Sequence, residues 1–132
     1  MSDNPQHIPP LRLYEGPFRR VSTVAMCTDG EHFVSGSDNH TLRLWNIATG
    51  ECERVYEGHT HYISNVVVCA DGKHFVSGSD DETLRLWNIA TGECKRVYYG
   101  HTYIVEAVAV CVDGEHFVSG SSDETLLLWH IA

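Results

Sequence analysis

The sequence lacks the features that nucleic-acid-binding, membrane-spanning and secreted proteins need. Nine Lys and Arg residues face eighteen Asp and Glu residues, the formal charge is −9, and no basic run is longer than Arg19-Arg20. Such a chain repels a phosphate backbone and an anionic membrane. No apolar run approaches the ~20 residues that span a bilayer, and residues 1–5 lack the basic and apolar segments of a signal peptide. We expect no nucleic-acid or membrane partner, and a soluble cytoplasmic protein, with the nucleus also open.

Cysteine pairs of the kind that bind zinc or form catalytic disulfides are also missing. The five cysteines include no Cys-x-x-Cys pair, and their number is odd. Cys27, Cys69 and Cys111 lie 42 residues apart, as do Cys52 and Cys94. Because this spacing is that of a repeat, we interpret them as reduced thiols that act as small apolar residues.

A repeat of 42 residues dominates what is present. A shift of 42 places Glu31 to Tyr56 over Lys73 to Tyr98 with 22 of 26 positions identical, and a third copy follows from Glu115 to Ala132. Each copy holds short runs of strand-forming residues separated by turns such as Asp29-Gly30. We predict strands at 21–26, 32–37, 41–46 and 51–56, at 63–68, 74–79, 83–88 and 93–98, and at 105–110, 116–121 and 125–130.

Four antiparallel strands per repeat, with no helical pattern, predict an all-β fold of four-stranded propeller blades, three per chain. Residues 11–16 align with residues 53–58 and predict one additional outer strand. We divide the chain into a flexible tail at 1–10 and three repeats at 11–132. Within the latter, the outer strand covers 11–16 and the repeats cover about 17–58, 59–100 and 101–132.

Short motifs recur around these strands. Gly58-His59 and Gly100-His101 precede the first strand of a copy, and Ser-Gly-Ser with a turn Asp precedes a strand that ends in Trp. With these motifs, the sequence resembles the WD40 repeat family over nearly the whole chain. In that family a His, a Ser, the turn Asp and the Trp hydrogen-bond in series. The resemblance implies two such sets: His59, Ser77, Asp81 and Trp87, and His101, Ser119, Asp123 and Trp129.

The first copy departs from the family pattern. It keeps Ser35 and Trp45, but Pro17 stands for the His and Asn39 for the Asp, so its set is partial. The Trp-Asp pair that names the family is also altered in every copy, to Trp-Asn or Trp-His.

Catalysis and metal binding are the alternative readings of these side chains. His59, Ser77 and Asp81 could form a hydrolase triad, but a nucleophilic Ser must be exposed beside its base, and these positions recur inside every blade. His32 and His74 occupy one repeat position a whole blade apart, so they cannot share an ion. We predict no enzyme, no metal site and no cofactor.

Three blades are too few to close a propeller, which has about 4–8. The third blade lacks an outer strand, and residues 11–16 lack a blade. We expect head-to-tail self-association, in which Leu11, Arg12, Leu13 and Tyr14 of one copy complete the third blade of the next. We favour a homodimer of six blades over a homotrimer of nine. The alternative is a truncated or designed fragment that pairs with a different chain.

The WD40 resemblance implies a scaffold that binds an unidentified protein or peptide on its loop face. The implied contact residues lie before the first strand or the turn acid of each copy: Phe18, Arg20, Asp38, Thr60, Tyr62, Asp80, Thr102, Ile104 and Ser122. They differ between copies, and Arg and Tyr are common interface anchors. Drift at unconstrained loops, or repeat amplification without a specific ligand, would produce the same variation.

Overall fold

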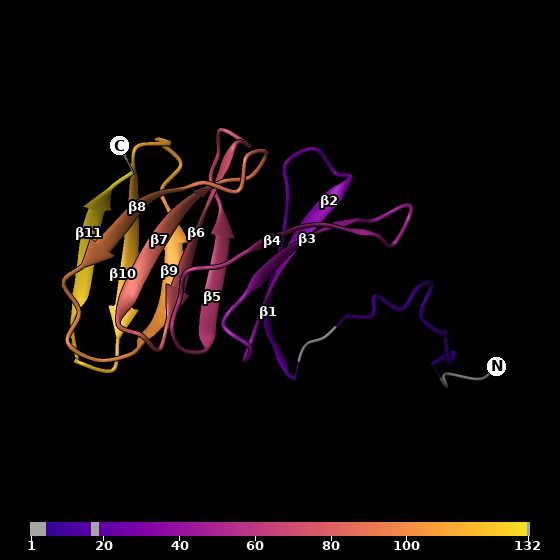
Figure 1. Ribbon diagram of the computed structural model, residues 1–132, viewed down its shortest axis with the longest axis horizontal. Coiled ribbons are helices and arrows are strands. Elements are labelled where there is room, and N and C mark those ends of the chain that lie inside the picture. The colour runs from indigo at the N-terminus through magenta and orange to yellow at the C-terminus, as the bar shows by residue number, and fades with distance from the viewer. Residues whose placement is uncertain (1–4, 17–18, 132) are drawn as a thin grey trace.

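The computed structural model describes residues 5–16 and 19–131, in which three antiparallel sheets stand side by side in chain order (Figure 1). Blade 1 contains β1 (Val21–Met26), β2 (His32–Ser37), β3 (Leu42–Asn46) and β4 (Cys52–Tyr56). Blade 2 contains β5 (Ile63–Val68), β6 (His74–Ser79), β7 (Thr83–Asn88) and β8 (Cys94–Tyr99). Blade 3 contains β9 (Val105–Val110), β10 (His116–Ser121) and β11 (Leu126–His130). The described residues include no helix with the length and apolarity that a membrane crossing requires.

The first two strands of every blade have the predicted bounds because Asp-Gly turns end one strand and begin the next. Asp29 Oδ1 accepts hydrogen bonds from the backbone N–H of Glu31 at 2.7 Å and of His32 at 3.1 Å. Gly30 adopts a φ of 70°, a left-handed conformation that a side chain disfavours. The third strand of blade 3 begins at Leu126, one residue later than predicted. In blade 2 the equivalent Thr83 pairs with Tyr99 of the outer strand β8, and the described part of blade 3 has no such strand.

The hydrophobic core lies between blades, not within one sheet. Val34 and Leu42 of blade 1 pack with Ile63, Phe75 and Trp87 of blade 2. The same positions, shifted by one repeat, form the second core between blades 2 and 3. Each blade is therefore stable only when a neighbour covers its apolar faces.

Of two predictions about the outer strands, one is confirmed and one is wrong within the described residues. Blade 3 has three strands, as its missing outer strand predicts, but residues 11–16, which were expected to form an outer strand, form none. An outer strand needs an open sheet edge beside it, and the open edge, β11, lies at the opposite end of the row from the N-terminal segment (Figure 1). The segment has the residues of an outer strand but no edge to pair with.

The N-terminal segment nevertheless docks on blade 1 as a real outer strand would. A Tyr hydroxyl donates to a backbone carbonyl of the following blade at three equivalent places: Tyr14 to Ile47 at 2.9 Å, Tyr56 to Ile89 at 2.7 Å, and Tyr98 to Ile131 at 2.7 Å. The ring of Tyr14 lies 5.0 Å from Phe33, and the ring of Tyr56 lies 4.9 Å from Phe75. Residues 11–16 therefore occupy the place of the outer strand of a preceding blade.

Candidate functional site

A directed chain of hydrogen bonds links the four implied residues of blade 2. Trp87 Nε1 donates to Ser77 Oγ at 2.8 Å, and Ser77 Oγ lies 2.6 Å from His59 Nε2. His59 Nδ1 lies 2.7 Å from Asp81 Oδ2. A neutral imidazole with its proton on Nδ1 satisfies every member, because Ser77 then donates to Nε2 while Asp81 accepts from Nδ1.

Burial makes this network costly to break. The side chain of His59 is 0% exposed and that of Asp81 is 7% exposed. Burial raises the pKa of Asp81, but hydrogen bonds from His59 and Thr83 more than offset it, and the pKa of the carboxyl lies well below its usual range. Gly58 leaves room beside the network, because a Cβ there would lie 2.8 Å from Nη1 of Arg85 and 3.1 Å from Cη2 of Trp87.

Blade 3 repeats the arrangement with a longer contact. His101 Nε2 lies 2.7 Å from Ser119 Oγ, which accepts from Trp129 Nε1 at 2.8 Å. His101 Nδ1 lies 3.1 Å from Asp123 Oδ2. Hydrogen bonds, the strongest from Thr125, hold the pKa of Asp123 below its usual range.

Blade 1 holds the partial set. Trp45 Nε1 donates to Ser35 Oγ at 2.9 Å. Asn39 accepts from Thr41 Oγ1 at 2.6 Å within its own turn. Pro17, which replaces the His, lies outside the described residues.

The buried serines are placed to orient side chains, not to attack a substrate. Ser77 is 0% exposed and Ser119 is 1% exposed. The Oγ of each is held between a Trp donor and an imidazole, which is the opposite of the open position that a nucleophile needs. These hydrogen bonds fix the positions of the Trp and His side chains within blades 2 and 3.

The implied partner-binding residues meet in pairs at one end of the blades. The backbone N–H of Asp38 donates to the carbonyl of Arg20 at 2.9 Å, and the equivalent bonds join Asp80 to Tyr62 at 2.9 Å and Ser122 to Ile104 at 3.2 Å. Beside these pairs, the N–H groups of Thr60 and Thr102 donate to Asp81 and Asp123. Phe18 lies outside the described residues.

An aromatic cluster at this end was not anticipated from the sequence. The ring of His40 lies 6.1 Å from His61 and 6.3 Å from Tyr62, and His61 and Tyr62 are 4.6 Å apart. His40 has a φ of 72° in the turn between β2 and β3, and its ring lies beside two rings of the segment that leads into β5 of blade 2. The sequence signal for this cluster was His40 itself, which occupies a repeat position where the other copies have Glu82 and Glu124.

The opposite end of the blades carries two acidic turns that were not predicted from the sequence. Metal binding had been considered only between histidines of different blades. One turn contains Asp29, Glu31 and His32, and the other contains Asp113, Glu115 and His116. Within each turn, the side-chain atoms that could bind a metal ion lie within 4.8 Å of one another. The carboxylates are exposed, and His32 Nδ1 is already 2.7 Å from Asp29, a hydrogen bond that raises the pKa of His32. Hydrogen bonds within the turn therefore explain why these side chains lie close together. The sequence Asp-Gly-Glu-His marks both turns.

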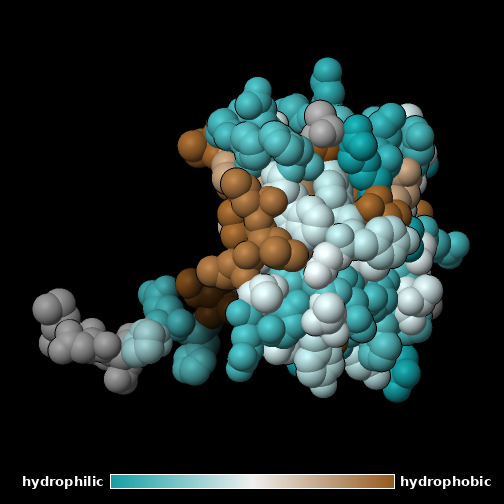
Figure 2. Space-filling model, turned by 90° about the vertical axis from the view of Figure 1, so that its left-hand side faces the viewer, coloured by the Kyte–Doolittle hydropathy of each residue, from teal (hydrophilic) through white to brown (hydrophobic). Residues whose placement is uncertain are grey.

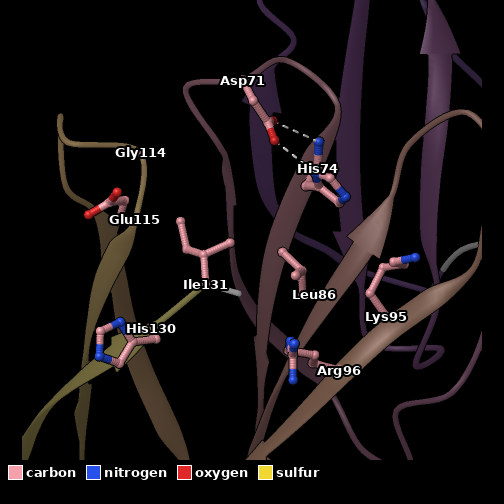
Figure 3. A pocket seen from close by; sticks show the side chains of 9 residues that line it. All are labelled: Asp71, His74, Leu86, Lys95, Arg96, Gly114, Glu115, His130 and Ile131. Carbon is pink, nitrogen blue, oxygen red and sulfur yellow. Dashed lines mark hydrogen bonds and ion pairs between the residues drawn. The ribbon is translucent and has the colours of Figure 1, made fainter.

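A cavity of about 840 Å³ opens between blades 2 and 3 at the same end (Figure 3). Lys95 and Arg96 lie on one side, and Glu115 and His130 lie on the other. A smaller cavity of about 380 Å³ occupies the equivalent place between blades 1 and 2, where Ala90 forms part of its wall. Asp29 and His32 line the smaller cavity and their repeat partners Asp71 and His74 line the larger one, so the same feature recurs at both junctions between blades.

The two end blades expose apolar faces that are buried elsewhere in the row. Leu126 and Leu128 of blade 3 are 79% and 67% exposed, whereas their counterparts Leu42 and Leu44 are 0% and 8% exposed. Val24 and Met26 expose the other face of blade 1 in the same way. Figure 2, which views the molecule from the blade 3 side, shows a brown apolar patch among polar side chains. Such patches mark interaction surfaces.

In a comparison with known protein families, the chain matches the family described as "WD domain, G-beta repeat" at residues 8–46, 50–88 and 92–130. Among curated relatives, a ribosome biogenesis protein BOP1 homolog of Monosiga brevicollis is 46% identical over 45 residues, which is 34% of this chain and 6% of that protein. A BOP1 homolog of Drosophila willistoni is 46% identical over 42 residues, 32% of this chain and 5% of that protein. The chain thus matches about one-twentieth of the length of these relatives.

Proposed function

Because the chain belongs to the WD40 repeat family, we propose that it is a non-catalytic scaffold for protein–protein interaction that self-assembles head-to-tail into a closed propeller. One observation carries the assembly: Tyr14 docks on blade 1 with the contacts that Tyr56 makes to blade 2. A segment with the sequence pattern of an outer strand is thus held in place, while the sheet that it would complete is missing from the described chain. The burial of Ser77 supports the non-catalytic part.

The register of the pairing between copies follows from the blades that are complete. In blade 1, Leu42, Arg43 and Leu44 of β3 pair with Tyr56, Val55 and Arg54 of β4, and blade 2 repeats this register. Transferred to the junction, Leu126, Leu127 and Leu128 of one copy pair with Tyr14, Leu13 and Arg12 of the next. The same docking covers the apolar faces of blades 1 and 3 with each other.

Two copies would form six blades and three would form nine, and we propose the six-bladed ring because it lies within the usual range of about 4–8 blades. Light scattering on the purified 132-residue polypeptide tests this. We expect twice the chain mass of 14.8 kDa, and three times that mass would instead indicate nine blades. A folded monomer at all concentrations would overturn self-assembly and leave a different chain as the source of the remaining blades.

We propose that a protein or peptide partner binds the loop face at Tyr62, which is 40% exposed beside His40 and His61. A partly exposed aromatic ring supported by other rings is a common binding anchor. Replacing Tyr62 with alanine should weaken capture of the partner about tenfold or more. Quantitative mass spectrometry of proteins captured by wild type and variant measures this.

Tyr99→Ala provides the matched control, since Tyr99 is also exposed but lies on the outer strand β8. Partner recovery should be unchanged by this variant. Equal recovery with Tyr62→Ala and wild type would rule out Tyr62 as the anchor.

The relatives do not extend a role in ribosome biogenesis to this chain. Their matches cover 45 and 42 residues, and the repeat in this sequence is 42 residues long. A match of one blade reflects the shared blade structure, which occurs in proteins of many functions.

A further inference from the structure

We infer that charge complementarity between the two end blades selects the head-to-tail order of copies. Glu106 and Glu124 of blade 3 would face Arg19 and Arg20 of blade 1 in the next copy. This inference rests on the proposed self-assembly. It adds the residues that favour binding of a second copy at the open end of the row of blades.

The first evidence is the contact between blades 1 and 2 at the loop face. His40, in the turn after β2, lies 6.1 Å from His61 and 6.3 Å from Tyr62, measured between ring centroids. The turn residue of one blade therefore faces the two residues that precede the first strand of the next blade.

Because the blades repeat, the equivalent residues should have the same arrangement at the junction between copies. His40, Glu82 and Glu124 occupy one turn position and share left-handed φ values of 72°, 75° and 71°. The carbonyls of Arg20, Tyr62 and Ile104 accept the same backbone hydrogen bond from the adjacent turn. Glu124 of one copy would consequently face Arg19 and Arg20 of the next, as His40 faces His61 and Tyr62.

The second evidence comes from the first strand of each blade. Ser22 Oγ donates to the carbonyl of Ile63 in the next blade at 2.5 Å, and Ser64 makes the equivalent bond to Val105. The third copy has Glu106 at this position, and it is exposed. An ionised carboxylate cannot donate this bond and requires a cationic or N–H partner instead. Arg20 directly precedes Val21, which is the counterpart of Ile63.

At these same loop-face positions, the two junctions inside the chain place no pair of opposite charges among the described residues. Between blades 2 and 3, Glu82 and Ser64 lie on the one side and Tyr103 and Ile104 on the other. Only at the junction between copies would two acids meet two arginines. In a chain with a formal charge of −9, copies repel one another, and a local match of opposite charges favours one orientation over the others. Arg20, which the family resemblance implies as a partner-binding residue, would then lie at the junction between copies.

Charge reversal on either side tests the inference. We expect E106R/E124R and R19E/R20E each to raise the dissociation constant of self-association about 100-fold, because like charges would then meet at every junction. The quadruple variant R19E/R20E/E106R/E124R restores opposite charges and should assemble like wild type. It should not co-assemble with wild type, since both mixed junctions would bring like charges together.

E82R is the matched control, because Glu82 has the turn geometry of Glu124 but belongs to the junction between blades 2 and 3 inside the chain. Its self-association should equal that of wild type, and circular dichroism should show every variant to be folded. A monomeric wild type would overturn the proposed self-assembly itself. A wild-type oligomer whose assembly is unchanged by both double variants, or not restored in the quadruple variant, would overturn the charge pairing alone.

Discussion

Replacing Asp81 with alanine is expected to lower the free energy of unfolding by about 3 kcal/mol, or the melting temperature by about 10 °C. The variant leaves His59 Nδ1, in a side chain that is 0% exposed, without its 2.7 Å partner. It also removes the acceptor of hydrogen bonds from the hydroxyl and N–H of Thr83 and the N–H of Thr60. Urea unfolding at pH 7 and one fixed protein concentration measures the loss.

Asp80→Ala is the control because it removes the same charge one residue away. Asp80 is joined to the carbonyl of Tyr62 through its backbone N–H, which alanine keeps. We expect a change within about 0.5 kcal/mol. Equal losses in the two variants would mean that the network around His59 does not stabilise the blade.

The pH dependence of the Asp81→Ala effect provides an independent check. The pKa of Asp81 is lowered in the folded protein, and in the unfolded chain it is about 3.9. A lowered folded pKa contributes stability that is fully present above the unfolded pKa and is lost as the pH falls below it. The stability difference between wild type and Asp81→Ala should therefore shrink below about pH 4. A difference that stays constant from pH 7 to pH 3 contradicts this account.

The sequence was most informative where the same local chemistry recurs in every copy. Asp-Gly turns and β-branched runs set the bounds of β1, β2, β5, β6, β9 and β10, since both signals act within a few residues. The set of His59, Ser77, Asp81 and Trp87 followed from the resemblance to the WD40 family, and the repeat places its counterpart 42 residues later, in blade 3. Their hydrogen bonds in the structure have lengths of 2.6–2.8 Å.

Features that depend on a neighbouring blade were harder to predict from the sequence. Residues 11–16 have the pattern of an outer strand but form none, because strand formation requires an edge and not only a suitable sequence. The cluster of His40, His61 and Tyr62 joins residues of two blades across a turn whose left-handed φ is not encoded by a Gly. Periodicity identifies equivalent positions, but it does not show which of them face each other between blades.

Replacing Leu128 with aspartate should separate assembly from folding, because the side chain is 67% exposed in the chain itself. Its counterparts Leu44 and Leu86 are 8% and 4% exposed beneath the next blade. We expect folding stability to change by less than about 1 kcal/mol, while each junction loses about 2 kcal/mol of leucine burial and gains a buried charge.

A closed ring of two copies contains this junction twice, so the Leu128→Asp penalty should act twice and raise the dissociation constant more than about 100-fold. Light scattering over a range of concentrations measures assembly, and thermal unfolding followed by circular dichroism measures folding. Leu86→Asp introduces the same charge under blade 3, where it should unfold the chain instead of dissociating it. A Leu128→Asp polypeptide that keeps the wild-type mass on dilution would show that copies do not join through this face, since no buried junction of this geometry tolerates an unpaired carboxylate.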